Sequence, residues 1–106
     1  MSDTPARDQI IVLGTFELDP TDRDTFIESR REQVAESRAE AGNLEYAFSA
    51  DGRDPGRVLL TERWASHEQF QAHLDRINAQ RGPDGPVEAV PIRDRSFAVF
   101  RAQPIG

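Results

Sequence analysis

Residues 58–74 read VLLTERWASHEQFQAHL and contain a strand, a short turn and the first part of a helix. Residues 58–64, which end at Trp64, the only tryptophan, read as a β-strand, in which successive side chains alternate between the two faces of the sheet. The alternation places Val58, Leu60 and Glu62 on the same face as Trp64. The rarer side chains of the chain are therefore concentrated at one strand-to-helix junction.

A helix is predicted directly after this strand. Ser66 is a favoured N-cap residue, and Gln69 stands three positions later, at the spacing of a capping box. The predicted buried stripe of the helix consists of Phe70, Leu74 and Ile77. His73 lies beside this stripe, and the run GPDGP over 82–86 ends the helix.

The remaining elements follow on either side of this junction. Strands are predicted over 10–18, 44–49, 58–64 and 96–102, and helices over 22–41 and from 66 to the glycine at 82. The turn-rich residues 51–56, DGRDPG, join two strands in a hairpin. The order βαββαβ predicts an α+β, ferredoxin-like fold, an antiparallel sheet with two helices on one face. We expect residues 1–8 to form a disordered tail and residues 9–106 a single domain.

The strand patterns also predict how the chain assembles. Two helices cover only one face of a sheet, yet both faces carry apolar residues. One set is Ile10, Val12, Leu60, Phe97 and Val99, and the set opposite in phase is Ile11, Leu13, Leu59, Ala98 and Phe100. The second set would be buried if two copies packed sheet against sheet about a two-fold axis. We therefore expect a homodimer.

Composition excludes several classes of protein. The chain has no cysteine, so disulfides, thiolate nucleophiles and cysteine-bound metals are excluded. Its 13 basic residues, all arginine, are outnumbered by 19 acidic ones, and a net charge of -6 disfavours nucleic acid as a partner. The polar N-terminus and the lack of a long apolar run predict a cytoplasmic protein that does not bind membranes. No motif for a metal, phosphate or cofactor site is present, and none is predicted.

Several short segments together resemble a known family. They are GNLEY over 42–46, TERW over 61–64, Ser66, and AHL over 72–74, separated by a hairpin and a helix start. In this order the chain resembles the antibiotic biosynthesis monooxygenase family of the dimeric α+β barrel superfamily, over roughly residues 10–80. The resemblance implies a cleft between sheet and helices. It also implies oxidation of small aromatic, quinol or polyketide-like substrates by dioxygen without metal or flavin.

The resemblance and the residue chemistry together suggest candidate site residues. The predicted catalytic residues are His73 and Trp64, and the predicted substrate-binding residues are Tyr46, Glu62, Phe70 and Leu60. His73 would handle protons, because its ordinary pKa is near ~6.5. Trp64 and Phe70 would shape an aromatic slot, and Tyr46 or Glu62 would bind a phenolic oxygen.

Each of these residues also has a purely structural interpretation. Trp64 and Tyr46 are alternatively core residues, and His73 is alternatively a half-buried helix histidine satisfied by a neighbour. An unpaired Glu62 on an apolar face would be costly, so it would pair with an arginine such as Arg30, or orient His73. His67, in the first turn of the helix, is expected to be solvated.

The chain departs from its apparent relatives at several positions. Leu60 and Phe70 stand where some monooxygenases of this type have Asn and Tyr, and Asn78 stands where others have a second His. Gly14 and the absence of any His after position 73 disfavour haem degradation. These departures favour an alternative function, a non-catalytic dimeric module that binds a small ligand.

Overall fold

The computed structural model describes residues 8–85 and 87–106, so residues 1–7 of the predicted tail lie outside the described residues. Its elements are β1 (Gln9–Glu17), a 3-10 turn η1 (Pro20–Asp22), α1 (Arg23–Ser29), α2 (Arg31–Arg38), β2 (Asn43–Ala50), β3 (Arg57–Trp64), α3 (His67–Arg81) and β4 (Asp94–Ala102). The predicted α+β, ferredoxin-like fold is confirmed.

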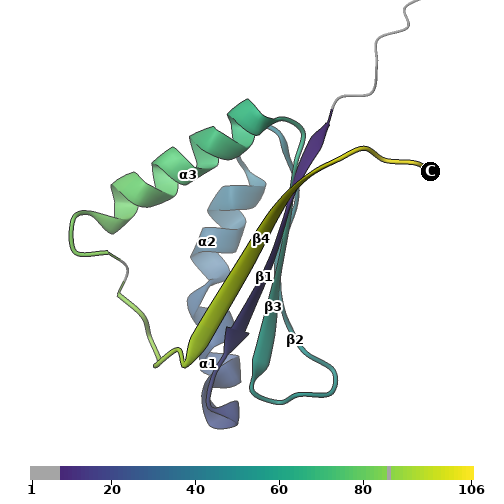
Figure 1. Ribbon diagram of the computed structural model, residues 1–106. Helices are drawn as coiled ribbons and strands as arrows, with labels where there is room; N and C mark the ends of the chain where they lie inside the picture. Colours follow the sequence, from purple (N-terminus) through teal and green to yellow (C-terminus); the bar gives the residue numbers. More distant parts are fainter. Residues whose placement is uncertain (1–7, 86) are drawn as a thin grey trace, which may run out of the picture.

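All four strands belong to one antiparallel sheet with the order β2-β3-β1-β4. The central strands β1 and β3 pair from Ile10 opposite Trp64 to Glu17 opposite Arg57. The helices lie on one side of this sheet, as Figure 1 shows. Helix α2 packs on β2, and α3 packs on β1 and β3, so both helices cover the same face of the sheet.

The first predicted helix is wrong in its extent. A single helix was expected over 22–41, but α1 ends at Ser29 and α2 ends at Arg38. The hydroxyl of Ser29 donates to the carbonyl of Phe26 at 2.5 Å, and a side chain that bonds to the preceding turn in this way bends a helix. Because α2 stops early, Glu40 lies in the turn after it and extends toward α3.

The junction after β3 has the predicted form. Ser66 caps α3, because its hydroxyl accepts the backbone N–H of Gln69 at 3.2 Å. At the other end Gly82 has φ 71°, a left-handed conformation that glycine adopts without strain. The capped start fixes α3 within two residues of Trp64, which brings His73 over the sheet.

The hydrophobic core lies between the sheet and the helices. At one end of the sheet the rings of Phe16 and Phe26 lie 5.0 Å apart, and Phe48 lies 6.0 Å from Phe26. At the other end Trp64 is packed against Phe70, with ring centres 6.5 Å apart. The two aromatic groups thus fill the ends of the core and leave room between them.

The opposite face of the sheet has no described helix over it (Figure 1). Leu13 is 49% exposed and Phe100 on β4 is 47% exposed, and Ala98 pairs with Leu13 on this face. An apolar sheet face therefore remains accessible to another protein surface.

None of the described helices is both long enough and apolar enough to cross a membrane.

Candidate active site

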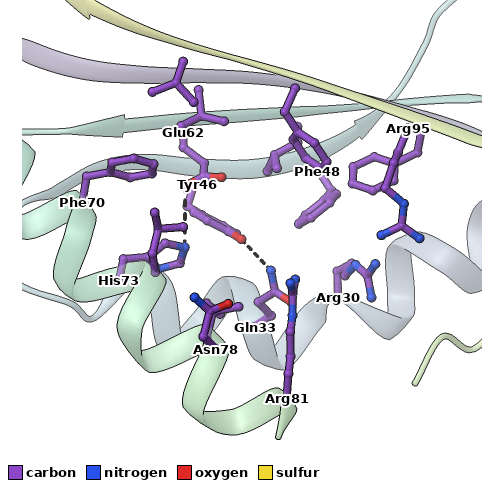
Figure 2. A pocket seen from close by; sticks show the side chains of 17 residues that line it. Arg30, Gln33, Tyr46, Phe48, Glu62, Phe70, His73, Asn78, Arg81 and Arg95 are labelled. Atoms are coloured by element: carbon purple, nitrogen blue, oxygen red, sulfur yellow. Dashed lines mark hydrogen bonds and ion pairs between the residues drawn. The ribbon is translucent and has the colours of Figure 1, made fainter. Parts of the chain in front are cut away.

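A cavity of about 350 Å³ lies between the sheet and the helices, within the size range of small-molecule sites. Most of its wall is apolar, and the polar groups lie at separate places along it. The lining residues are Val12, Phe16, Arg30, Gln33, Tyr46, Phe48, Leu60, Glu62, Phe70, His73, Leu74, Ile77, Asn78, Arg81, Arg95, Phe97 and Val99. Figure 2 shows these side chains converging from the sheet, α2 and α3.

Five of the six candidate site residues lie in this wall, and Trp64 does not. Tyr46 and Glu62 are cross-strand partners on β2 and β3, whereas Phe70 and His73 come from α3. Trp64 is 0% exposed and does not line the cavity. Trp64 was expected to form part of the wall of an aromatic slot, but its side chain does not reach the cavity.

Trp64 instead packs behind the polar groups. Its indole N–H donates to Oε1 of Glu62 at 3.0 Å, and its ring lies 4.6 Å from the imidazole of His73 at an interplanar angle of 35°. A buried indole usually finds such a partner for its N–H. The tryptophan therefore fixes both Glu62 and His73 from the side away from the cavity.

His73 is 3% exposed and has a carboxylate partner on each side. Its Nδ1 lies 3.1 Å from Oε1 of Glu40, and Glu40 is itself paired with the guanidinium of Arg76. Since a carboxylate only accepts hydrogen bonds, this contact assigns the proton of the neutral imidazole to Nδ1. Nε2 then carries the lone pair of the ring, and this nitrogen atom lies 3.7 Å from Oε1 of Glu62.

Burial sets the pKa values of these two groups in opposite directions. Desolvation lowers the pKa of His73, and the hydrogen bond and charge of Glu40 oppose that effect only in part. Desolvation raises the pKa of Glu62 to about 7, against the hydrogen bond from Trp64, and the charge of Glu40 adds to the rise. Near neutral pH the site thus holds a neutral imidazole beside a carboxyl group that titrates.

The expected pairing of Glu62 with Arg30 does not occur. Arg30 binds Glu88 instead, with Nη2 2.8 Å from Oε1, and its guanidinium lies over the ring of Phe26. The second expectation, that Glu62 lies beside His73, agrees with the geometry. Glu62 has no described arginine partner because its side chain extends toward α3 near His73.

Tyr46 presents a hydroxyl group in the middle of the cavity wall (Figure 2). Its oxygen accepts Nε2–H of Gln33 at 2.6 Å, so its own proton remains available to another acceptor. Burial, together with the charge of Glu62, raises the pKa of Tyr46 to about 12. The hydroxyl therefore keeps its proton at neutral pH and acts as a donor.

Two residues that hold this site were not predicted from the sequence. Gln33 lies on α2 and Glu40 in the turn after it, and neither belongs to a recognisable motif. One signal was present: His73 and Arg76 stand three residues apart on one helix face, where one acidic partner can reach both. Among the described residues, no three His, Cys, Asp or Glu side chains are grouped so as to hold a metal ion.

The fold and the cavity define a ferredoxin-like domain with a ligand-sized site between its sheet and helices. The family model for antibiotic biosynthesis monooxygenases matches residues 9–82, and the chain belongs to this family. Its predicted resemblance to that family is thereby confirmed.

Solved structures agree on the fold. A Pseudomonas aeruginosa protein is 19% identical, with a TM-score of 0.71 over 94% of this chain and 99% of its own. A Deinococcus radiodurans protein, described as a candidate antibiotic biosynthesis monooxygenase, is 22% identical, with a TM-score of 0.68 over 90% and 93%. An antibiotic biosynthesis monooxygenase is 23% identical, with a TM-score of 0.63 over 90% and 99%. No curated protein matches the sequence.

Proposed function

We propose that this protein is a cofactor-independent monooxygenase that oxidises a small aromatic, quinol or polyketide-like substrate with dioxygen. The observation that carries the proposal is the state of His73. Its Nδ1 is tied to Glu40, while Nε2 carries the lone pair 3.7 Å from Oε1 of Glu62, and both residues line the cavity. An oriented, neutral imidazole in a mostly apolar site is suited to remove the proton of a phenol.

The side chains have separate roles in this reaction. His73 takes the proton of the phenolic hydroxyl at Nε2, and the nearby carboxylate of Glu62 stabilises the imidazolium that forms. Tyr46 donates its hydroxyl hydrogen to the phenolate oxygen. Trp64 does not touch the substrate and acts as a positioning residue for Glu62 and His73.

The chemistry is balanced without an external reductant. The phenolate gives one electron to dioxygen, and the resulting radical and superoxide combine at the ring carbon opposite the oxygen. His73 returns its proton to the peroxide, the carbon loses its hydrogen as a proton, and the O–O bond breaks. One oxygen atom stays as a quinone carbonyl and the other leaves as water, so phenol and dioxygen give quinone and water. The substrate supplies all the electrons.

A non-catalytic ligand-binding module is the second candidate. Leu60 and Phe70 occupy the cavity wall at positions where some relatives are expected to have Asn and Tyr, and neither side chain can hydrogen-bond to a reacting oxygen. Such a module would hold an aromatic ligand without oxidising it. The two functions differ in whether the protein consumes oxygen.

Oxygen uptake separates the two candidates. Metal-stripped protein is mixed with hydroquinones, naphthols and anthrones, and we expect protein-dependent dioxygen consumption with at least one of them. Leu60→Phe places a ring in the cavity and should abolish uptake, whereas Leu44→Phe changes an exposed leucine and should not. If no compound is consumed while the same compounds quench the fluorescence of Trp64, the chain is a binding module and not an oxygenase.

We also propose that the protein is a homodimer that buries the bare face of the sheet. Leu13→Glu would place a charge at the centre of that interface in both copies, which should weaken the dimer about a hundredfold or more. Light scattering should give twice 11.9 kDa for the parent protein and 11.9 kDa for the variant. Ile105→Glu, at an exposed apolar residue outside the strands, should remain dimeric. A monomeric parent at micromolar concentration would contradict the proposal.

A further inference from the structure

The end of the cavity away from His73 is cationic. Arg30, Arg81 and Arg95 line this end, and Figure 2 shows them on the other side of Tyr46 from His73. This is unexpected in a chain with a net charge of -6. Among the described residues that line the cavity, Glu62 supplies the one carboxylate, and it lies at the His73 end.

The distance between the His73 end and the arginine end of the cavity follows from α3 and, independently, from the sheet, and the two values agree. Arg81 stands two turns beyond His73 on α3, which is a rise of about 12 Å. On the sheet, Val12 links Glu62 to Val99 across neighbouring strands, and Arg95 stands four residues before Val99, about 13 Å along β4. A ligand that contacts both ends must therefore be longer than a single benzene ring.

The cationic end is organised before any ligand arrives. The guanidinium of Arg30 lies 4.5 Å from the ring centre of Phe26, and its side chain is 15% exposed. Glu88 pairs with Arg30 at 2.8 Å and is 3.7 Å from Arg95, so one carboxylate serves two arginines. No described carboxylate lies within ion-pair distance of Arg81. Three arginines against one glutamate leave an excess of two positive charges at this end.

We propose that the substrate is a fused-ring phenol that carries a carboxylate at the end opposite its reactive hydroxyl. The carboxylate would bind at Arg81 and Arg95, since arginine presents paired N–H donors that match both carboxylate oxygens. The fused rings would lie along the apolar wall, and the phenol would then reach His73 and Tyr46. The orientation of the phenol rests on the proposed function, but recognition of the carboxylate does not depend on it.

Calorimetric titration of the full-length protein under nitrogen tests this proposal without turnover. The ligands are 6-hydroxy-2-naphthoate, with its groups at opposite ends, 3-hydroxy-2-naphthoate, with its groups adjacent, and 2-naphthol, which has no carboxylate. We expect 6-hydroxy-2-naphthoate to bind about fivefold more tightly than 2-naphthol, the size of a partly solvated charge pair. The adjacent isomer should bind more weakly than 6-hydroxy-2-naphthoate, because it cannot reach both ends.

Variants assign the effect to particular residues. Arg81→Gln and Arg95→Gln should each weaken 6-hydroxy-2-naphthoate several-fold and leave 2-naphthol unchanged. Arg53→Gln removes the same charge from the exposed hairpin and should change neither. Equal affinity for 6-hydroxy-2-naphthoate and 2-naphthol, or equal losses for both in the arginine variants, would overturn the proposal. Selective carboxylate binding, together with no oxygen consumption in air by any compound of the hydroquinone, naphthol and anthrone panel, would instead reject the monooxygenase and keep this site.

Discussion

Replacing His73 by Gln is expected to lower the turnover of an oxidisable phenol by about two to four orders of magnitude, the usual contribution of a positioned general base. An amide cannot take up a proton at neutral pH, whereas Nε2 of His73 can. Glutamine still fills most of the space of the imidazole, so substrate binding should change much less than kcat. Stopped-flow absorbance and oxygen uptake under saturating substrate measure the effect.

The same substitution at the other histidine is the matched control. His67→Gln changes an exposed residue in the first turn of α3, and its turnover should equal that of the parent. The deficit of His73→Gln should also shrink above the pKa of the substrate phenol, because a phenolate needs no base. A deficit that stays constant at high pH, or an equal loss in both variants, would show that His73 does not act as a base.

The pH dependence of turnover has a defined sign. Burial lowers the pKa of His73, so the imidazole stays neutral below the pH at which a free histidine would gain a proton. Turnover of the parent should therefore fall first as the pH drops through about 7, where the carboxylate of Glu62 that stabilises the imidazolium gains a proton, and protonation of His73 should add to the fall only below pH ~6.5. Tyr46 imposes no limit on the alkaline side near neutrality, because its pKa is raised to about 12.

The fold was predictable because local signals and packing agree in most elements. The strand that ends at Trp64, the cap at Ser66 and the glycine at position 82 each mark a boundary by short-range chemistry. The first helix was predicted less well. Its composition favours a continuous helix, and only the bond from Ser29 to the preceding turn explains where it bends.

The candidate site was predictable only in part, for a physical reason. A period-two strand places Tyr46 and Glu62 on one face of the sheet, so their position as neighbours on the helix side follows from sequence. The contact between Glu40 and His73 joins positions far apart in the chain and depends on where α2 ends. Trp64 lies on the same strand face as Glu62, yet it packs against Phe70 and His73 of α3 and does not line the cavity. Sequence period alone does not distinguish a cavity wall from the neighbouring core.

Glu62→Gln is expected to stabilise the protein at alkaline pH and to have little effect in acid. The carboxyl of Glu62 has an ordinary pKa of 4.5 when unfolded, and burial raises it to about 7 in the folded state. The folded state therefore holds a proton more tightly, and its stability falls as pH rises from 4.5 through 7. Above pH 7 the shift corresponds to about 3 kcal/mol of lost folding free energy. Glutamine has no such charge and keeps an oxygen to accept the indole N–H of Trp64.

Urea unfolding followed by Trp64 fluorescence at fixed protein concentration measures this difference between pH 5 and pH 8. The free energy of unfolding of Glu62→Gln should exceed that of the parent by about 3 kcal/mol at pH 8, and the excess should largely vanish near pH 4.5. Glu45→Gln removes an exposed carboxylate from the neighbouring strand and should follow the parent throughout. An excess that is the same at pH 5 and pH 8 would mean that Glu62 does not titrate in this range.

His73 contributes a pH dependence of opposite sign, and the Glu62 variant exposes it. The lowered pKa of His73 means that the unfolded chain gains a proton below pH ~6.5 that the folded chain does not, so stability falls on acidification. In the parent this loss offsets the gain from protonating Glu62 between pH 4.5 and 6.5. In Glu62→Gln only the His73 effect remains, and stability should decline steadily below pH ~6.5. The parent should therefore lose less stability on acidification than Glu62→Gln, because the pKa values of its two neighbouring groups, Glu62 and His73, are moved in opposite directions.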